Sequence, residues 1–72
     1  MLNMKHLRQQ RSETQAEVAQ ALGISERNYK RIENGKNRPR LNTAWSLEEH
    51  YGQSIKFLLE THDYSVTSIS PM

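Results

Sequence analysis

Two arginines and a lysine recur at helical spacing within the segment ERNYKRIEN. Arg27 and Arg31 are four residues apart, so in a helix both side chains leave the same face, with Lys30 beside them. A guanidinium group carries paired N–H donors that match the O6 and N7 acceptors of guanine in the major groove. The spacing therefore predicts hydrogen-bond donors directed at base edges.

Neighbouring polar residues extend this candidate site. Asn28 can pair with adenine, and Glu26 can accept from the amino group of cytosine. Phosphate contacts are expected at the start of the preceding helix, where free backbone N–H groups favour an anion, and in the loop that follows. The candidate base-contacting residues are Glu26, Arg27, Asn28, Lys30 and Arg31, and the candidate phosphate-contacting residues are Gln15, Asn34, Lys36, Asn37, Arg38 and Arg40.

The charge of the chain is unevenly distributed. The 72 residues have a net charge of only +2, but six of the ten cations fall between Arg27 and Arg40. Such polarity favours one basic surface for an anionic partner. The alternative is an ordinary solvated helix in which Glu26 and Lys30 form an i,i+4 ion pair, since short charge runs are usually solvated.

The central part of the chain predicts two helices joined by a tight turn. Thr14-Gln15-Ala16-Glu17 is a capping box, which marks the first turn of a helix. Gly23 ends that helix, because glycine adopts the left-handed conformation readily. Ser25 is a good N-cap for the next helix, about residues 25–34, which turns Tyr29 inward. Two helices joined in this way form a helix-turn-helix, whose second helix enters the DNA major groove.

Three more helices are expected around this unit. The first runs from about residue 3 to residue 10. After a basic loop, Asn42 or Thr43 can cap a helix that ends at Gly52, and Ser54 can cap a short last helix. The inward residues of the five helices are expected to be Met4, Leu7, Val18, Ala19, Leu22, Tyr29, Ile32, Ala44, Leu47, Tyr51, Ile55, Leu58 and Leu59.

The expected organisation is an all-α, five-helix domain at residues 1–60 and a C-terminal tail at residues 61–72. The tail is rich in Ser and Thr, and its composition leaves open an extended arm, a short strand or a disordered segment. Trp45 and Phe57 lie beside the inward faces of their helices, and aromatic residues are enriched at protein interfaces. Each can instead fold over a small core. The candidate dimer contacts are Trp45, Phe57, Tyr64 and Val66.

Several motifs occur together in a combination that is more specific than any one of them. They are Leu7-Arg8, Thr14 to Ala19, Leu22-Gly23-Ile24-Ser25, Ile32-Glu33-Asn34-Gly35-Lys36, Pro39, Leu47, Gly52 and Ile55 to Leu59. In this combination the chain resembles the phage-repressor and Cro-like helix-turn-helix family, often called the Xre family, over about residues 3–60. The resemblance implies a repressor-like domain that binds operator DNA, usually as a dimer. It also implies that Gln15, Glu26, Arg27, Asn28 and Arg31 face the DNA.

The same resemblance places the first helix against the end of the third, which brings Arg8 close to Glu33. We favour a partly covered structural ion pair between them, and a phosphate contact by Arg8 is the alternative. The chain departs from the family at Tyr29, Ala44 and Glu48, where a smaller aliphatic, a larger aliphatic and a small residue are usual. The packing of the third helix on the fourth is therefore expected to differ.

Other function classes receive little support from the sequence. There is no Cys for a disulfide or thiolate site, and His6, His50 and His62 lack the spacing of metal ligands. We therefore expect no metal, no cofactor and no enzymatic activity. No segment has the apolar length of a membrane span or the form of a signal peptide, so a cytoplasmic setting is expected.

The sequence predicts a transcriptional regulator, most often a repressor, that binds double-stranded DNA at a two-fold operator as a homodimer. Two alternatives remain open at this point. One is an antitoxin that binds DNA and also a toxin partner. The other is a protein-interaction module that keeps the fold without recognising DNA.

Overall fold

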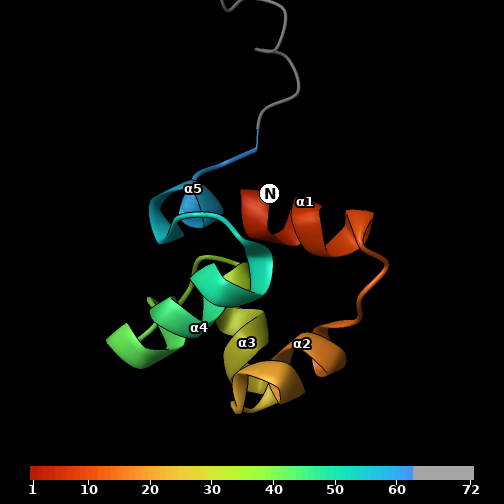
Figure 1. Ribbon diagram of the computed structural model, residues 1–72, viewed down its shortest axis with the longest axis vertical. Helices are drawn as coiled ribbons and strands as arrows, with labels where there is room; N and C mark the ends of the chain where they lie inside the picture. Colours follow the sequence, from red (N-terminus) through yellow and green to blue (C-terminus); the bar gives the residue numbers. More distant parts are fainter. Residues whose placement is uncertain (63–72) are drawn as a thin grey trace, which may run out of the picture.

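A computed structural model describes residues 1–62, and this part of the chain consists of five helices and one isolated antiparallel bridge (Figure 1). The helices are α1 (Asn3–Gln10), α2 (Gln15–Leu22), α3 (Glu26–Glu33), α4 (Leu41–Tyr51) and α5 (Ile55–Leu59). The predicted all-α, five-helix class is confirmed. None of these helices has the length and apolar character of a membrane span. The candidate contacts Tyr64 and Val66 lie outside the described residues.

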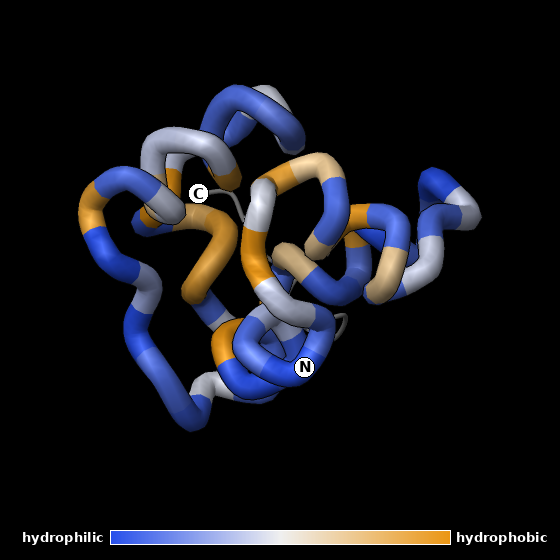
Figure 2. The backbone as a smooth tube through the Cα atoms, turned by 90° about the horizontal axis from the view of Figure 1, so that it is seen from below, coloured by the Kyte–Doolittle hydropathy of each residue, from blue (hydrophilic) through white to orange (hydrophobic). Residues whose placement is uncertain are grey.

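The hydrophobic core receives side chains from all five helices. Its buried members are Met4, Val18, Ala19, Tyr29, Ile32, Leu47, Tyr51 and Leu58, and the partly buried residues packed against it are Leu7, Leu22, Ile24, Ile55 and Leu59. Figure 2 shows apolar positions where the helices converge and hydrophilic positions along the outer loops. The inward faces follow the predicted periodicity, although Ala44 is only partly buried.

Local capping signals determine where α2 and α3 begin. Thr14 Oγ1 accepts from the Glu17 N–H at 3.0 Å, and Glu17 Oε1 accepts from the Thr14 N–H at 2.8 Å, which completes the predicted capping box. Gly23 follows α2 in the left-handed conformation with φ +73°. Ser25 Oγ then accepts from the Asn28 N–H at 3.0 Å. The starts of α2 and α3 are thus set by short-range contacts whose residues are recognisable in the sequence.

The start of α4 differs from the prediction. Asn42 or Thr43 was expected to cap this helix, but Arg40 is its N-cap and Leu41 is its first residue. The first turn closes earlier because the Arg40 carbonyl accepts from the Ala44 N–H at 2.8 Å. No side chain caps this end, so α4 begins without the capping signal that the prediction used.

The two ends of the described chain are held together. Leu2 and Thr61 form the antiparallel bridge, and the His62 N–H donates to the Met1 carbonyl at 2.7 Å. Figure 1 shows the N-terminus beside α5. The first two residues of the predicted tail at 61–72 therefore belong to the folded unit, and the rest of that tail lies outside the described residues.

Candidate nucleic-acid interface

The exposed side of α3 gathers most of the candidate base-contacting residues. Tyr29 and Ile32 are buried on its inner side, which leaves the cationic side chains exposed. Glu26, Arg27, Lys30, Arg31, Asn34 and Lys36 line one open hollow, which we call the α3 outer face. Four of these six residues are cationic, so the hollow suits an anionic ligand.

Two of these residues pair with each other. Lys30 Nζ lies 3.5 Å from Glu26 Oε2, and both side chains are about half exposed. A pair this exposed contributes little to stability, so these side chains can exchange partners readily. Arg27 and Arg31 form no ion pair within residues 1–62, so their charges remain available on the surface.

Arg31 also contacts the loop that follows α3. With the Asn37 amide oriented to match its neighbours, its oxygen accepts from Arg31 Nε at 3.1 Å and its nitrogen donates to the Lys36 carbonyl at 3.0 Å. This contact uses the inner nitrogen of the guanidinium, so both terminal nitrogens remain for a bidentate contact with a base. Asn37, proposed from the sequence as a phosphate ligand, thus has a partner that the sequence did not reveal.

The end of α3 directs the basic loop along the side of this helix. The Lys36 N–H donates to the Arg31 carbonyl at 2.8 Å, and Gly35 has φ +75°, as in a Schellman motif. A second hollow is lined by Asn28, Ile32, Asn37, Arg38, Pro39, Arg40 and Thr43. The structure therefore places Asn28 with the loop cations and apart from the α3 outer face.

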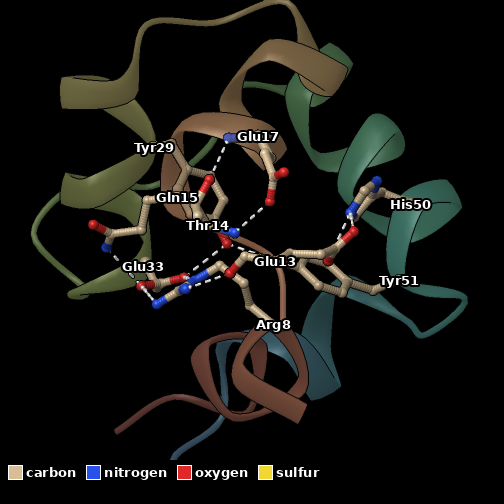
Figure 3. Close-up of polar contacts among 9 residues, drawn as sticks. All are labelled: Arg8, Glu13, Thr14, Gln15, Glu17, Tyr29, Glu33, His50 and Tyr51. Atoms are coloured by element: carbon tan, nitrogen blue, oxygen red, sulfur yellow. Dashed lines mark hydrogen bonds and ion pairs between the residues drawn. The ribbon is translucent and has the colours of Figure 1, made fainter. Parts of the chain in front are cut away.

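Gln15 at the start of α2 has a partner inside the protein. Its Nε2 donates to Glu33 Oε1 at 2.8 Å (Figure 3). One of the two amide N–H groups is therefore used inside the protein, and the second leaves the predicted phosphate contact of Gln15 in place. The start of α2 also offers backbone N–H groups to an anion.

Glu33 is the centre of a buried polar cluster (Figure 3). Arg8 donates from Nε to Oε2 at 2.7 Å and from Nη2 to Oε1 at 3.2 Å, and the Tyr29 hydroxyl donates to Oε2 at 2.8 Å. The contact expected between Arg8 and Glu33 is thus present. Arg8 also donates to the Glu13 carbonyl at 2.8 Å, so its guanidinium is committed to the interior rather than to phosphate.

The charges of this cluster remain in place at neutral pH. Burial raises the pKa of the Glu33 carboxyl, but the hydrogen bonds from Arg8, Tyr29 and Gln15 outweigh it and bring the pKa below its ordinary value. The hydrogen bond to Glu33 raises the pKa of Arg8. Arg8 and Glu33 therefore both remain charged, and their ion pair joins α1 to α3.

The unusual tyrosine of α3 extends the cluster to α4. The Tyr29 and Tyr51 hydroxyl oxygens are 2.7 Å apart, and both side chains are buried. Burial raises the pKa of both phenols, that of Tyr51 to about 12. The expected change in α3–α4 packing therefore takes the form of a hydroxyl contact between the two helices.

Because the Tyr29 and Tyr51 phenols are buried, the protein is expected to lose stability in alkaline solution. An unfolded tyrosine loses its proton near pH 10, whereas Tyr51 stays neutral in the folded chain up to about pH 12. The unfolded chain therefore binds fewer protons in this window, and the free energy of unfolding falls as the pH rises through it. Urea unfolding between pH 8 and pH 11.5 measures the decline, and Tyr51→Phe is expected to make it shallower than in the wild type. Equal declines in the two proteins would contradict this role of Tyr51.

Two contacts that involve histidine side chains were not predicted from the sequence. The His6 and His62 rings stack with centroids 3.9 Å apart, and His50 Nε2 lies 3.1 Å from Glu13 Oε2. Among residues 1–62, no three His, Cys, Asp or Glu side chains converge as metal ligands would. These contacts join segments that are distant in sequence, so no local spacing could have found them.

Most of the chain, including the candidate interface, matches a known protein family. The family model described as Helix-turn-helix matches residues 4–58, from α1 into α5. No curated protein and no solved structure matches the chain. The matched region contains both the α3 outer face and the Glu33 cluster.

Proposed function

The chain belongs to the helix-turn-helix family of DNA-binding transcriptional regulators, of the Xre type, and from this premise we propose that it is a sequence-specific repressor. It binds a two-fold operator in double-stranded DNA as a homodimer, with α3 of each copy in the major groove. Repression follows from occupancy of the operator, which excludes the polymerase. Residues 1–60 form the DNA-binding domain, no cofactor is required, and the setting is the cytoplasm.

The observation that carries this proposal is the presence on α3 of two arginines that form no ion pair within residues 1–62. Arg27 and Arg31 occupy one exposed hollow, and Asn37 orients the guanidinium of Arg31. A bidentate contact with guanine discriminates against a wrong base by about 1–3 kcal/mol. We assign Arg27 and Arg31 to guanine, with Glu26 and Lys30 as neighbouring contacts on the same face.

Phosphate contacts on both sides of α3 would hold it in register. The loop after α3 supplies three cations, Lys36, Arg38 and Arg40, and the first turn of α2 supplies backbone N–H groups. The residues that we assign to phosphate are Asn34, Lys36, Arg38, Arg40 and Gln15. Asn28 lies in the hollow beside the loop. We assign it to a base at the edge of the site, next to the phosphates that the loop contacts.

Affinity for DNA is expected to fall steeply with salt. With three to five phosphate contacts from each protomer, raising the salt concentration from 50 to 200 mM should weaken binding about 10³–10⁵-fold. Arg38→Ala should make the plot of log affinity against log salt shallower by about 1 for each protomer. Anisotropy titrations at several salt concentrations measure the slope, and a salt-independent affinity would contradict phosphate binding by this surface.

Selection of binding sites from random duplex DNA tests the function as a whole. The expected product is a palindrome with guanine in each half-site and half-site centres about 34–36 Å apart. Failure to enrich any sequence would overturn the proposal, and the basic surface would then belong to a protein-interaction module. Capture of a second protein that competes with DNA would instead favour an antitoxin.

A further inference from the structure

The carboxylate of Glu33 is held at both of its oxygens. It is 1 % exposed and accepts four hydrogen bonds, two at each oxygen. Arg8 contacts both oxygens and Tyr29 contacts Oε2, so the position and the plane of the carboxylate are fixed. The remaining bond, at Oε1, comes from the side chain of Gln15.

The direction of each hydrogen bond in this cluster follows from the chemistry of its members. A carboxylate has no proton to donate, so the Tyr29 hydroxyl donates to Glu33, and the Tyr51 hydroxyl must then donate to Tyr29. For the same reason the Gln15 amide turns its nitrogen, and not its oxygen, toward Glu33. The far end of a flexible side chain is thus tied to a rigid group.

The tied amide keeps one donor for a ligand. Its nitrogen carries two N–H groups, of which Glu33 accepts one and no other residue among 1–62 accepts the second. Gln15 is partly exposed and is the first residue of α2, where the helix end favours an anion. Figure 3 shows the amide at the outer edge of the cluster, with its nitrogen turned toward Glu33. One nitrogen can therefore bridge the buried carboxylate and a phosphate oxygen at the surface.

We propose that Glu33 is a positioning residue for DNA binding, which holds the Gln15 amide where its second N–H meets a phosphate of the DNA backbone. Ordering a flexible side chain when a complex forms lowers the affinity about 2- to 12-fold. The bond to Glu33 orders Gln15 in the free protein, so this loss is avoided when DNA binds. The inference rests on the proposed function and deepens it, because it gives a buried residue a share in the phosphate contact.

The same bond connects the two helices of the helix-turn-helix. Glu33 belongs to α3, whose outer face carries Arg27 and Arg31, whereas Gln15 belongs to α2. A phosphate bound by Gln15 is therefore one hydrogen bond away from the helix that we assign to the bases. This connection would keep α3 at a constant position relative to the DNA backbone, which is what a register contact requires.

A double-mutant cycle on DNA affinity tests this role. Gln15→Met removes the amide and keeps the length of the side chain, so it should weaken binding to the selected operator and to a duplex of scrambled half-sites alike, by about 10-fold or more for each half-site. In the background Arg8→Met with Glu33→Leu, which removes both buried charges together, the factor lost through Gln15→Met should be smaller by about 3-fold or more, because the amide is no longer held. Anisotropy titrations of the full chain measure the four affinities.

Salt dependence and a matched substitution separate this contact from others. A neutral amide displaces no counterion, so Gln15→Met should leave the slope of log affinity against log salt unchanged, unlike Arg38→Ala. Gln20→Met, the same exchange at an exposed position on α2, should leave the affinity unchanged in both backgrounds. Two candidate dimer contacts, Trp45 and Phe57, are 59 % and 39 % exposed on α4 and α5 and are the same in every variant, so any dimer contact cancels in the comparison.

NMR relaxation of the side-chain amide groups gives a second measurement, which does not depend on the folding of the double variant. The Gln15 signals are assigned by their absence from the spectrum of Gln15→Met. In the free wild type the Gln15 amide is expected to be ordered, whereas the exposed Gln20 amide is expected to be mobile. Addition of operator DNA should then shift the signal of the second Gln15 amide proton.

Two results would overturn this role of Glu33 and leave the proposed function standing. One is an equal factor for Gln15→Met in the two backgrounds, which is expected if the carboxylate contributes only to folding. The other is a Gln15 amide that is as mobile as that of Gln20 in the free wild type. A wild type that binds no duplex at all would instead contradict the proposed function, and this inference with it.

Discussion

Replacing Glu33 by alanine is expected to destabilise the fold by about 3–5 kcal/mol, because the substitution leaves one partner of a buried pair without its counter-charge. Arg8, whose side chain is only 11 % exposed, loses both hydrogen bonds to the carboxylate. Tyr29 and Gln15 each lose an acceptor as well. The loss is large for a domain of this size, whose total stability is expected to be only about 5–15 kcal/mol.

Urea unfolding of three variants at neutral pH distinguishes the buried charge from side-chain volume. Glu33→Ala should unfold at much lower urea concentration than wild type, whereas the exposed control Glu49→Ala should not. The double substitution Arg8→Met with Glu33→Leu should recover part of the loss, since no lone charge remains. A Glu33→Ala protein as stable as the wild type would show that the cluster contributes nothing.

Arg31→Ala is expected to reduce sequence preference much more than general DNA affinity. On the selected operator the substitution should weaken binding by about 1–3 kcal/mol for each half-site, whereas on random duplex the loss should be small. The reason is that a base contact is made only with the correct base, while a phosphate contact is made with every sequence. Arg38→Ala should therefore weaken binding to both duplexes alike.

Anisotropy titrations at one salt concentration, with the selected duplex and a duplex of scrambled half-sites, measure both effects. Asn37→Ala, which removes the contact at Arg31 Nε, should cause a smaller loss of preference in the same direction. Gln20→Ala on the exposed side of α2 is a neutral control. Equal losses on the two duplexes for Arg31→Ala would contradict a base-contacting role.

The helix boundaries that were predicted correctly depend on short-range chemistry. The Thr14–Glu17 capping box and the Ser25 cap each involve residues three apart, so the sequence alone contains both partners. The predicted start of α4 was wrong because it relied on Asn42 and Thr43, which are residue types that commonly cap helices. The helix begins after Arg40 instead, without a side-chain cap, so residue type at the helix start was not a sufficient guide.

The polar contacts of the site were less predictable. The Arg8–Glu33 pair was expected only through the family resemblance, since its residues are 25 positions apart. The inward position of Tyr29 followed from helical periodicity. The hydrogen bond between the Tyr29 and Tyr51 hydroxyl groups depends on how α3 and α4 are placed relative to each other. Gln15 and Asn37 were assigned to phosphate because each lies at a favourable chain position, and the structure gives each an internal partner.

Recognition of DNA sequence by α3 is tested most directly by selecting binding sites with the wild type and Arg31→Ala in parallel. The wild type is expected to enrich a palindrome with guanine in each half-site. The variant is expected to lose the preference at one position of each half-site and to keep the others. Selection of the same full site by both proteins would contradict base contact by Arg31, and enrichment of no site by the wild type would contradict sequence-specific binding itself.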